Sequence, residues 1–245
     1  MKNYKVILQY EGTRYQGWQR QESTENTLQG RLEALLSRMA GTEVPVQGSG
    51  RTDAGVHAYG QVINFHMDTK MTCEEICAYM NRYLPEDVAV IQIEEVSERF
   101  HSRLNAKGKV YRYRIWNDKI PNVFERRLLQ EIPEKLDVEA MRLAADRIIG
   151  THDFKAFTSA KKSRKSTVRT IDKIEIVQIE KEIAVIFYGN GFLYHMVRIL
   201  MGTLIEVGTN QRKPEDIDHI LTSGDRENAG ALAPAKGLAL MEVIY

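Results

Sequence analysis

The stretch Tyr4-Lys5-Val6-Ile7-Leu8-Gln9-Tyr10-Glu11-Gly12 predicts a mostly buried β-strand that ends at the glutamate, and it decides how the fold begins. Apolar residues then recur at helical spacing from Leu28 to Met39. An N-cap at Asn26 or Thr27 precedes this helix, and Gly41 stops it. The chain therefore opens with a strand followed by a helix.

Further strands and helices are interspersed along the rest of the chain. Strands are predicted at residues 44–46, 61–66, 88–96, 110–116, 171–179, 183–188 and 238–245. Helices are predicted at residues 72–83, 136–149 and 192–207, with Gly208 at the C′ position of the last, and a short helix begins at Pro214. Two halves of similar content predict an α+β fold with largely antiparallel sheets flanked by helices. The loop 117–123 sets the expected boundary between residues 1–116 and 117–245.

The composition of the 245 residues is that of a globular protein. Apolar residues make up 43% and charged residues 27%, which excludes collagen-like, disordered and supercharged classes. No stretch approaches the ~20 apolar residues of a membrane span. The two cysteines, Cys73 and Cys77, cannot build a disulfide framework and favour a reducing compartment. We expect a cytoplasmic protein without a membrane segment.

The net charge of +1 hides a segregation of charge. Residues 99–114 and residues 155–170 each hold six Lys or Arg and no acidic residue, and the remaining 213 residues carry a charge of about −11. Two acid-free basic segments on an otherwise acidic chain favour a polyanion-binding face over a merely solvated surface. Candidates for phosphate contacts are Arg103, Lys107, Lys161, Lys162, Arg164 and Lys165.

The most concentrated polar signal is the loop Gly48-Ser49-Gly50-Arg51-Thr52-Asp53-Ala54-Gly55-Val56-His57. Its glycines permit a close approach of another backbone. It is not a dinucleotide fingerprint, because Asp53 stands where the third glycine should be. The loop is either an ordinary glycine turn in which Asp53 bonds its own backbone, or the presentation of a carboxylate that Arg51 holds ionised.

The loop contains a single carboxylate, and this favours some reaction types over others. Glycoside hydrolysis needs two flanking acids, and Glu43 and Asp68 are ten and fifteen residues from Asp53 in the sequence. One aspartate beside an arginine suits a nucleophile or base that stays charged. The cysteine spacing Cys73-x-x-x-Cys77 does not match a zinc deaminase, and these cysteines are better explained as small helix-packing residues than as metal ligands with His66. The residue spacings therefore predict no metal site.

Two further residues are candidates for substrate binding. Tyr111 lies in the first basic segment, where it either stacks on a base or forms the core face of a strand with Tyr113 and Ile115. Arg198 falls about 60° beyond the apolar stripe of its helix at ~100° per residue. It either extends along the surface to solvent or reaches a buried anion.

With these motifs the sequence resembles the bacterial tRNA pseudouridine synthase A family. The matching motifs cover nearly the whole chain: Tyr10-Glu11-Gly12 with Gly17-Trp18-Gln19, Gly50 to Ala58, Phe100 to Tyr113, Gly191-Phe192 with His195-Met196-Val197-Arg198, and Gly237-Leu238-Ala239-Leu240.

The resemblance implies an active site and an assembly. It makes Asp53 the essential aspartate, Tyr111 the active-site tyrosine and Arg198 the partner of the aspartate. It also implies a homodimer without cofactor or metal, built from two ferredoxin-like halves per subunit with a basic cleft between them, that isomerises uridines 38, 39 and 40 of the tRNA anticodon arm. The first half would carry the aspartate loop, and the second would carry the basic loop and the helix of Arg198.

The mechanistic hypothesis is that the target uridine leaves the base stack before Asp53 acts on it. The residues do not decide whether Asp53 attacks C1′, adds to the ring or removes a sugar proton. Two alternatives stay open at this point. One is a non-catalytic RNA-binding protein, and the other is a nucleoside hydrolase or glycosidase.

Overall fold

The computed structural model describes residues 1–160 and 166–245, and these residues form two compact units. The first unit contains residues 1–107 and 239–245, and the second contains residues 108–238. Both units combine helices with mostly antiparallel strands, so the predicted α+β class is confirmed. The phosphate-contact candidates Lys161, Lys162, Arg164 and Lys165 lie outside the described residues.

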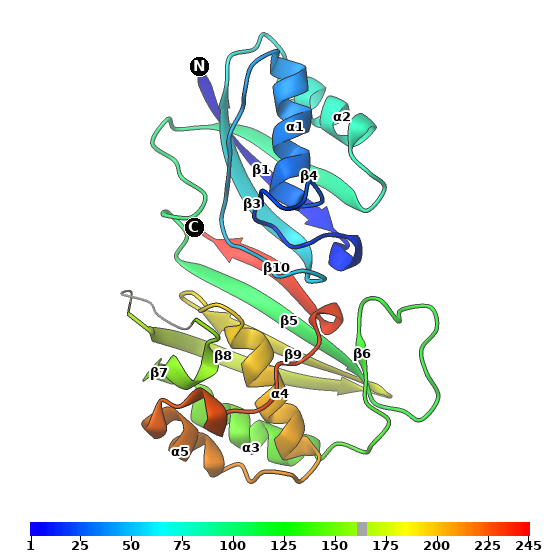
Figure 1. Ribbon diagram of the computed structural model, residues 1–245, viewed down its shortest axis with the longest axis vertical. Helices are drawn as coiled ribbons and strands as arrows, with labels where there is room; N and C mark the ends of the chain where they lie inside the picture. Colours follow the sequence, from blue (N-terminus) through cyan, green and yellow to red (C-terminus); the bar gives the residue numbers. More distant parts are fainter. Residues whose placement is uncertain (161–165) are drawn as a thin grey trace. The chain divides into compact units, whose positions relative to one another are not determined.

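The first unit has the βαββαβ order of a ferredoxin-like fold. Its elements are β1 (Lys2–Tyr10), α1 (Leu28–Ala40), β2 (Val46–Gly48), β3 (His57–Met67), α2 (Cys73–Tyr83), β4 (Val88–Val96) and the C-terminal strand β10 (Leu238–Ile244). The sheet order is β4-β1-β3-β2 with antiparallel neighbours, and β10 pairs in parallel with the start of β3. Figure 1 shows residues 1–107 of this unit in blue to green and β10 in red, with α1 and α2 beside the strands.

The local sequence explains the helix ends in this unit. Thr27, one of the two expected N-caps, accepts a hydrogen bond from the backbone of Gly30, and Gly41 ends α1 with a φ of 73°. Helix α2 begins with a capping box in which Thr72 and Glu75 each bond the other's backbone. The strand predicted at residues 88–96 has those bounds in the structure.

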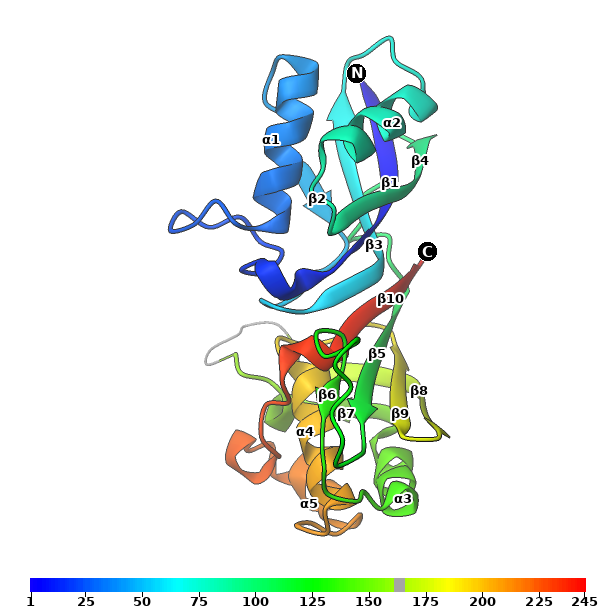
Figure 2. The ribbon, with the colours of Figure 1, turned by 90° about the vertical axis from the view of Figure 1, so that its right-hand side faces the viewer.

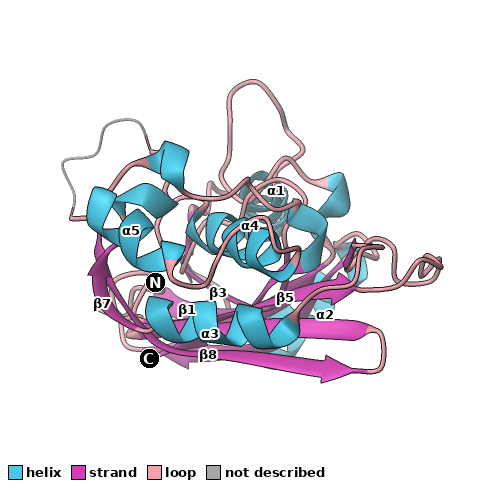
Figure 3. Cartoon of the chain, turned by 90° about the horizontal axis from the view of Figure 1, so that it is seen from below, coloured by secondary structure: helices cyan, strands magenta, loops and turns pink. Residues whose placement is uncertain are grey.

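The second unit repeats the beginning of this order. Its elements are β5 (Gly108–Trp116), β6 (Gln130–Glu131), α3 (Val138–Ile148), β7 (Gly150–Asp153), β8 (Val168–Ile179), β9 (Glu182–Gly189), α4 (Met196–Gly208) and α5 (Asp216–Ser223). Strands β5, β9, β8 and β7 are neighbours in that order, all antiparallel, and the hairpin predicted for β8 and β9 is confirmed. Because β5-α3-β8-β9-α4 follows the first five elements of the other unit, the two halves are similar. Figures 2 and 3 show α3, α4 and α5 packed near one another beside these strands.

The division of the chain differs from the expected boundary at residues 116 and 117. Strand β5 pairs with β9 from Lys109 to Trp116, so it belongs to the second unit from its first residue. The C-terminal strand pairs with β3 at residues 57 and 58, and residues 239–245 therefore belong to the first unit. No pattern in the sequence predicts that the last strand of the chain pairs with a strand of the first unit.

Three other expectations need correction. Helix α4 begins at Met196 instead of residue 192, because His195 has a φ of 64° and interrupts the helical backbone. Gly208 is the last helical residue instead of the C′ residue, and a Cβ on it would lie 2.8 Å from the sulfur of Met141. The edge strand expected at residues 44–46 begins at Val46, after the proline that cannot donate a ladder hydrogen bond.

Within the described part of the chain, none of the helices combines the length and the apolar character that crossing a membrane requires.

Candidate active site

Asp53 lies on the loop that joins β2 to β3, and its side chain is partly exposed. The neighbouring Thr52 is buried, and its carbonyl accepts a hydrogen bond from the backbone of Trp18 at 3.0 Å. The backbone of Val56 donates to the carbonyl of Asp53 at 3.1 Å and closes a turn in which Gly55 has a φ of 79°. The loop is therefore a tight turn with a partly exposed aspartate, and the role of Arg51 in keeping that carboxylate ionised stays a prediction.

A buried polar network lies beneath this loop. Ser49 Oγ donates to Gln61 Oε1 at 2.7 Å, and Gln61 Nε2 donates to the carbonyl of Gly50 at 3.1 Å. Gln61 Nε2 also donates to the hydroxyl of Tyr10 at 3.4 Å, and that hydroxyl lies 2.8 Å from Thr52 Oγ1. Burial raises the pKa of the Tyr10 phenol to about 12, so it stays protonated at neutral pH. The network ties the loop to β1 and β3 on both sides of Arg51.

Two glycines allow the N-terminal segment to touch the loop. A Cβ on Gly12 would lie 2.0 Å from the carbonyl oxygen of Val56. Gly17 has a φ of 87°, and a Cβ there would lie 3.0 Å from the carbonyl oxygen of Thr52. The motifs at residues 10–12 and 17–19 are thus the packing surface of the Asp53 loop.

His57 anchors the end of the loop. Its ring is buried, and its Nδ1 accepts a hydrogen bond from the backbone of Gly12 at 2.9 Å. Because that nitrogen accepts, the proton of the neutral ring is on Nε2. Glu11 Oε1 lies 3.9 Å from the same Nδ1. Arg51, two residues before Asp53, is exposed on the loop.

Tyr111 lies on β5 in the second unit and points toward the core of that unit. It is buried, and its ring meets the ring of Phe192 edge-on with centroids 5.1 Å apart. Tyr113 and Ile115 are fully buried on the same face of the strand. The tyrosines therefore form the core face that was one of the two interpretations of this segment, and the ring of Tyr111 is held by Phe192.

Arg198 is fixed to the segment that precedes β10. Its Nε donates to the carbonyl of Ala233 at 2.7 Å, and its own carbonyl accepts from the backbone of Ala233 at 3.1 Å. The next residue, Pro234, accepts a hydrogen bond from the hydroxyl of Tyr113 at 2.9 Å. Burial raises the pKa of the Tyr113 phenol, and the positive charge of Arg198 opposes that rise, which places the guanidinium near β5.

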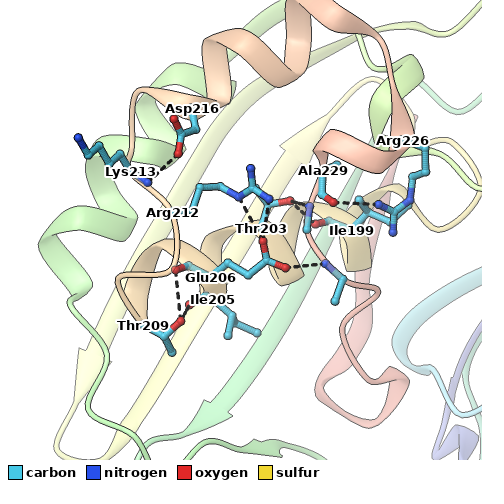
Figure 4. A network of polar contacts seen from close by, with 12 residues as sticks. Ile199, Thr203, Ile205, Glu206, Thr209, Arg212, Lys213, Asp216, Arg226 and Ala229 are labelled. Carbon is cyan, nitrogen blue, oxygen red and sulfur yellow. Dashed lines mark hydrogen bonds and ion pairs between the residues drawn. The ribbon is translucent and has the colours of Figure 1, made fainter.

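The segment that holds Arg198 is itself attached to α4, as Figure 4 shows. Thr203 Oγ1 accepts from the backbone of Gly230 at 2.9 Å, and Glu206 Oε1 accepts from the backbone of Ala231 at 2.8 Å. The other oxygen of Glu206 accepts two hydrogen bonds from Arg212, at 2.9 and 3.1 Å. Helix and segment thus form one rigid support for the arginine.

The remaining candidates for phosphate contacts lie at the surface or outside the described residues. Arg103 and Lys107 are exposed near the end of the first unit, where the backbone of Lys107 donates to the carbonyl of Ile244. Among the described residues no group of three or more His, Cys, Asp or Glu side chains is placed to hold a metal ion. Cys73 and Cys77 are free and partly buried on α2, and Asn81 donates to Cys77 Sγ at 3.6 Å.

Sequence reasoning missed the side chains that hold the loop. Gln61 and Ser49 were not singled out, although both are fully buried polar residues. The available signal was a glutamine in a strand whose neighbours at residues 62–65 are mostly apolar, because a buried amide needs partners.

The family model and the sequence relatives agree on one family. The family model described as tRNA pseudouridine synthase matches residues 6–105 and 144–245. The chain is 48% identical to tRNA pseudouridine synthase A of Bacillus sp. (strain KSM-64) and 46% identical to tRNA pseudouridine synthase A 1 of Clostridium tetani (strain Massachusetts / E88), in each case over 245 residues and 100% of both chains. A chain in a crystal structure of a Cbf5-Nop10-Gar1 complex has a TM-score of 0.35 and 12% identity, over 87% of this chain and 43% of that chain.

These matches place the protein among the isomerases that modify tRNA. More narrowly, the chain belongs to the tRNA pseudouridine synthase A family.

Proposed function

We propose that the protein isomerises uridines 38, 39 and 40 of the tRNA anticodon arm to pseudouridine, with Asp53 as the essential carboxylate. The observation that carries this proposal is the support of the Asp53 loop. A partly exposed aspartate stands on a turn that a buried network and two close glycine contacts hold in place. Catalytic groups need such preorganisation, because a small misplacement lowers the rate strongly.

The reaction moves one glycosidic bond. The target nucleotide leaves the base stack, which costs a few kcal/mol. The bond between N1 and C1′ breaks, the uracil turns, and a bond forms between C5 and C1′. The proton on C5 is lost and N1 gains a proton, so the product has the mass of the substrate. Asp53 acts on the flipped nucleotide, and the family motifs assign the support of this step to Tyr111 and Arg198.

Binding of the tRNA is proposed to rest on the two basic segments. Arg103 and Lys107 in the first, and Lys161, Lys162, Arg164 and Lys165 in the second, would contact phosphates, which position the RNA without reading its sequence. The functional form is proposed to be a cytoplasmic homodimer, and sedimentation of the purified chain with and without tRNA checks that state.

The substitution Asp53→Asn tests the catalytic role. The variant should bind an unmodified tRNA transcript as the wild type does and release no tritium from [5-³H]uridine in that transcript. Asp68→Asn, a change of an exposed aspartate in the same unit, is the matched control and should leave the release unchanged. Normal tritium release by Asp53→Asn would remove this residue from catalysis.

The positions are tested with transcripts that carry a single uridine at 38, 39 or 40 and none at the other two. Each transcript should yield one pseudouridine at that position, mapped by carbodiimide modification and primer extension, with no cofactor added and a chelator present. Free uracil or strand cleavage would favour a hydrolase instead.

A further inference from the structure

Tyr194 is an exposed aromatic residue in the loop between β9 and α4, and the function described so far does not use it. Its side chain is 57% exposed, although both neighbouring elements are largely buried. Its ring stacks on the ring of His195, with centroids 3.7 Å apart and an interplanar angle of 27°. Single exposed aromatics are common on protein surfaces, so the case depends on how this ring is held and on what surrounds it.

The stacked pair is fixed by hydrogen bonds to residues 158 and 159. The carbonyl of Tyr194 accepts from Thr158 Oγ1 at 3.0 Å and from the backbone of Ser159 at 3.3 Å. The ring of His195 bonds Ser159 Oγ through Nδ1 at 3.0 Å. His195 also adopts a φ of 64°, which a non-glycine residue keeps only where its surroundings impose it. The ring of Tyr194 is therefore a preorganised surface.

The stacked pair is hydrogen-bonded to a segment that contains no acidic residue. Thr158 and Ser159 belong to the acid-free basic segment of residues 155–170, and Arg169 of that segment lies within 3.8 Å of the position of a Cβ on Gly191, in the same loop as Tyr194. Phe192, two residues before Tyr194, contacts Tyr111. An exposed aromatic face in a loop that also contacts an arginine has the two kinds of group, aromatic and cationic, that bind single-stranded nucleic acid.

From this arrangement we propose that Tyr194, supported by His195, is a stacking platform for an unpaired nucleobase of the tRNA. The inference rests on the proposed function, because it takes tRNA as the ligand, and it adds a binding residue outside the Asp53 loop. Stacking on an aromatic ring does not read the identity of the base, so the contact adds affinity for many tRNAs rather than selecting one of them.

The test is equilibrium binding of an unmodified tRNA transcript to the full chain. Tyr194→Ala should weaken binding about 5- to 150-fold, the range that loss of one base stack produces. Tyr194→Phe and Tyr194→Trp should bind as the wild type does, because they keep an aromatic face. Tyr194→Leu should bind as weakly as the alanine variant. Tyr83→Ala, a change of another half-exposed tyrosine that contacts a neighbouring ring in the first unit, is the matched control and should have no effect.

The salt dependence separates stacking from a phosphate contact. The slope of log affinity against log salt should be the same for Tyr194→Ala and the wild type, because no counterion is released at a stacked base. Irradiation of a tRNA containing 5-bromouracil should attach the RNA to the peptide that contains residue 194. A lower salt slope, a phenylalanine variant as weak as alanine, or an alanine variant that binds within twofold of the wild type would each overturn the proposal.

The binding assay also keeps this proposal distinct from the proposed function. If the wild-type chain forms no pseudouridine but Tyr194→Ala still weakens binding, the platform stands and the isomerase assignment fails. If isomerisation occurs and Tyr194→Ala binds normally, the platform alone fails. A wild-type chain that does not bind tRNA refutes both, and a change in oligomeric state without a change in binding shows that the ring serves a protein contact instead.

Discussion

Gly12 is the residue at which one added carbon would most directly disturb the Asp53 loop. Its φ is not in the left-handed region, so the substitution Gly12→Ala acts through the 2.0 Å approach of the new Cβ to the carbonyl oxygen of Val56. Relief of this overlap requires a backbone shift three residues from Asp53. We expect a loss of about 1–3 kcal/mol in the free energy of unfolding and a fall on the order of 10²-fold in the rate of tritium release.

Urea unfolding and single-turnover tritium release check this prediction. The matched control is Gly41→Ala, at a position with a φ of 73° and nothing within 4 Å of an added Cβ. It should cost about 1 kcal/mol of backbone strain and leave the rate unchanged. If both variants lose activity to the same degree, the close contact at Gly12 has no special role in placing the loop.

Tyr10 makes the stability of the first unit depend on pH in the alkaline range. The folded phenol has a pKa of about 12 because it is buried, whereas an unfolded tyrosine ionises near 10. Between these values the unfolded chain releases a proton that the folded chain retains, so stability is complete below pH 10 and falls as the pH rises toward 12. Tyr10→Phe should reduce this fall by about 2–3 kcal/mol.

The same substitution removes two hydrogen-bond partners at neutral pH and should cost about 1–2 kcal/mol there. Urea unfolding at pH 7, 9 and 11 measures both effects, and at pH 11, midway between the two pKa values, about half of the alkaline difference, ~1.4 kcal/mol, should be present. Gly41→Ala, which is destabilised but keeps the phenol, should retain the wild-type dependence on pH. An unchanged alkaline fall in Tyr10→Phe would show that other tyrosines, such as the buried Tyr113 and the half-buried Tyr245, account for it.

Single residues also show what the sequence could and could not predict about the site. The tight, partly exposed loop that carries Asp53 was predictable because its glycines and polar residues favour a turn, whereas the catalytic role of Asp53 stays a prediction. Gln61 was not predictable, because its partners Tyr10, Ser49 and Gly50 come from distant parts of the chain. Only the folded sheet brings those groups together.

At the scale of elements, periodicity predicted the helices and strands well where one face of the element is buried. Strand β5 and helix α1 follow their apolar patterns closely. The pattern was misleading at the start of α4, because Leu193 continues the helical spacing of Val197 and Leu200. Residues 192–195 instead form a loop that packs Phe192 on Tyr111. Tertiary packing there outweighs the local pattern.

Two glycines of helix α4 are expected to differ in how strongly their substitution by alanine destabilises the protein. A Cβ on Gly202 would lie 1.7 Å from the carbonyl oxygen of Ala231, in the segment that holds Arg198. A Cβ on Gly208 would meet the side chains of Met141 and Leu136, which can move. Gly202→Ala should therefore destabilise the protein by about 3 kcal/mol and lower tritium release, since the segment must leave the helix.

Gly208→Ala is the control within the same helix. The gain in helix propensity of about 1 kcal/mol offsets much of the repacking, so its unfolding free energy should stay within about 1 kcal/mol of the wild type. Thermal or urea unfolding of the two variants gives the comparison. Equal destabilisation would mean that the backbone contact between α4 and residue 231 is not what fixes this segment.

At the scale of the whole molecule, the two similar halves were predictable from the repeated alternation of elements. The boundary between the halves was not predictable, because the unit to which β5 and β10 belong is decided by the strands with which they pair and not by their place in the sequence. The charge segregation is also a property of the whole chain. Residues 99–114 and 155–170 collect twelve bases that the rest of the sequence counterbalances with acids.

This segregation predicts that the position of basic residues, and not the net charge of the protein, determines how tightly tRNA binds. Replacing Lys161, Lys162, Arg164 and Lys165 together with glutamine should weaken tRNA binding and reduce the slope of log affinity against log salt by up to about 3, as loss of four phosphate contacts would. The control replaces four exposed lysines outside both segments, at positions 2, 70, 173 and 181, and lowers the net charge by the same amount. Its slope should stay near that of the wild type. Binding measured between 50 and 200 mM salt, the range over which phosphate contacts change affinity most clearly, separates the two variants. Equal slopes for the two variants would show that tRNA responds to the overall charge of the protein and that the basic segment is only a solvated surface.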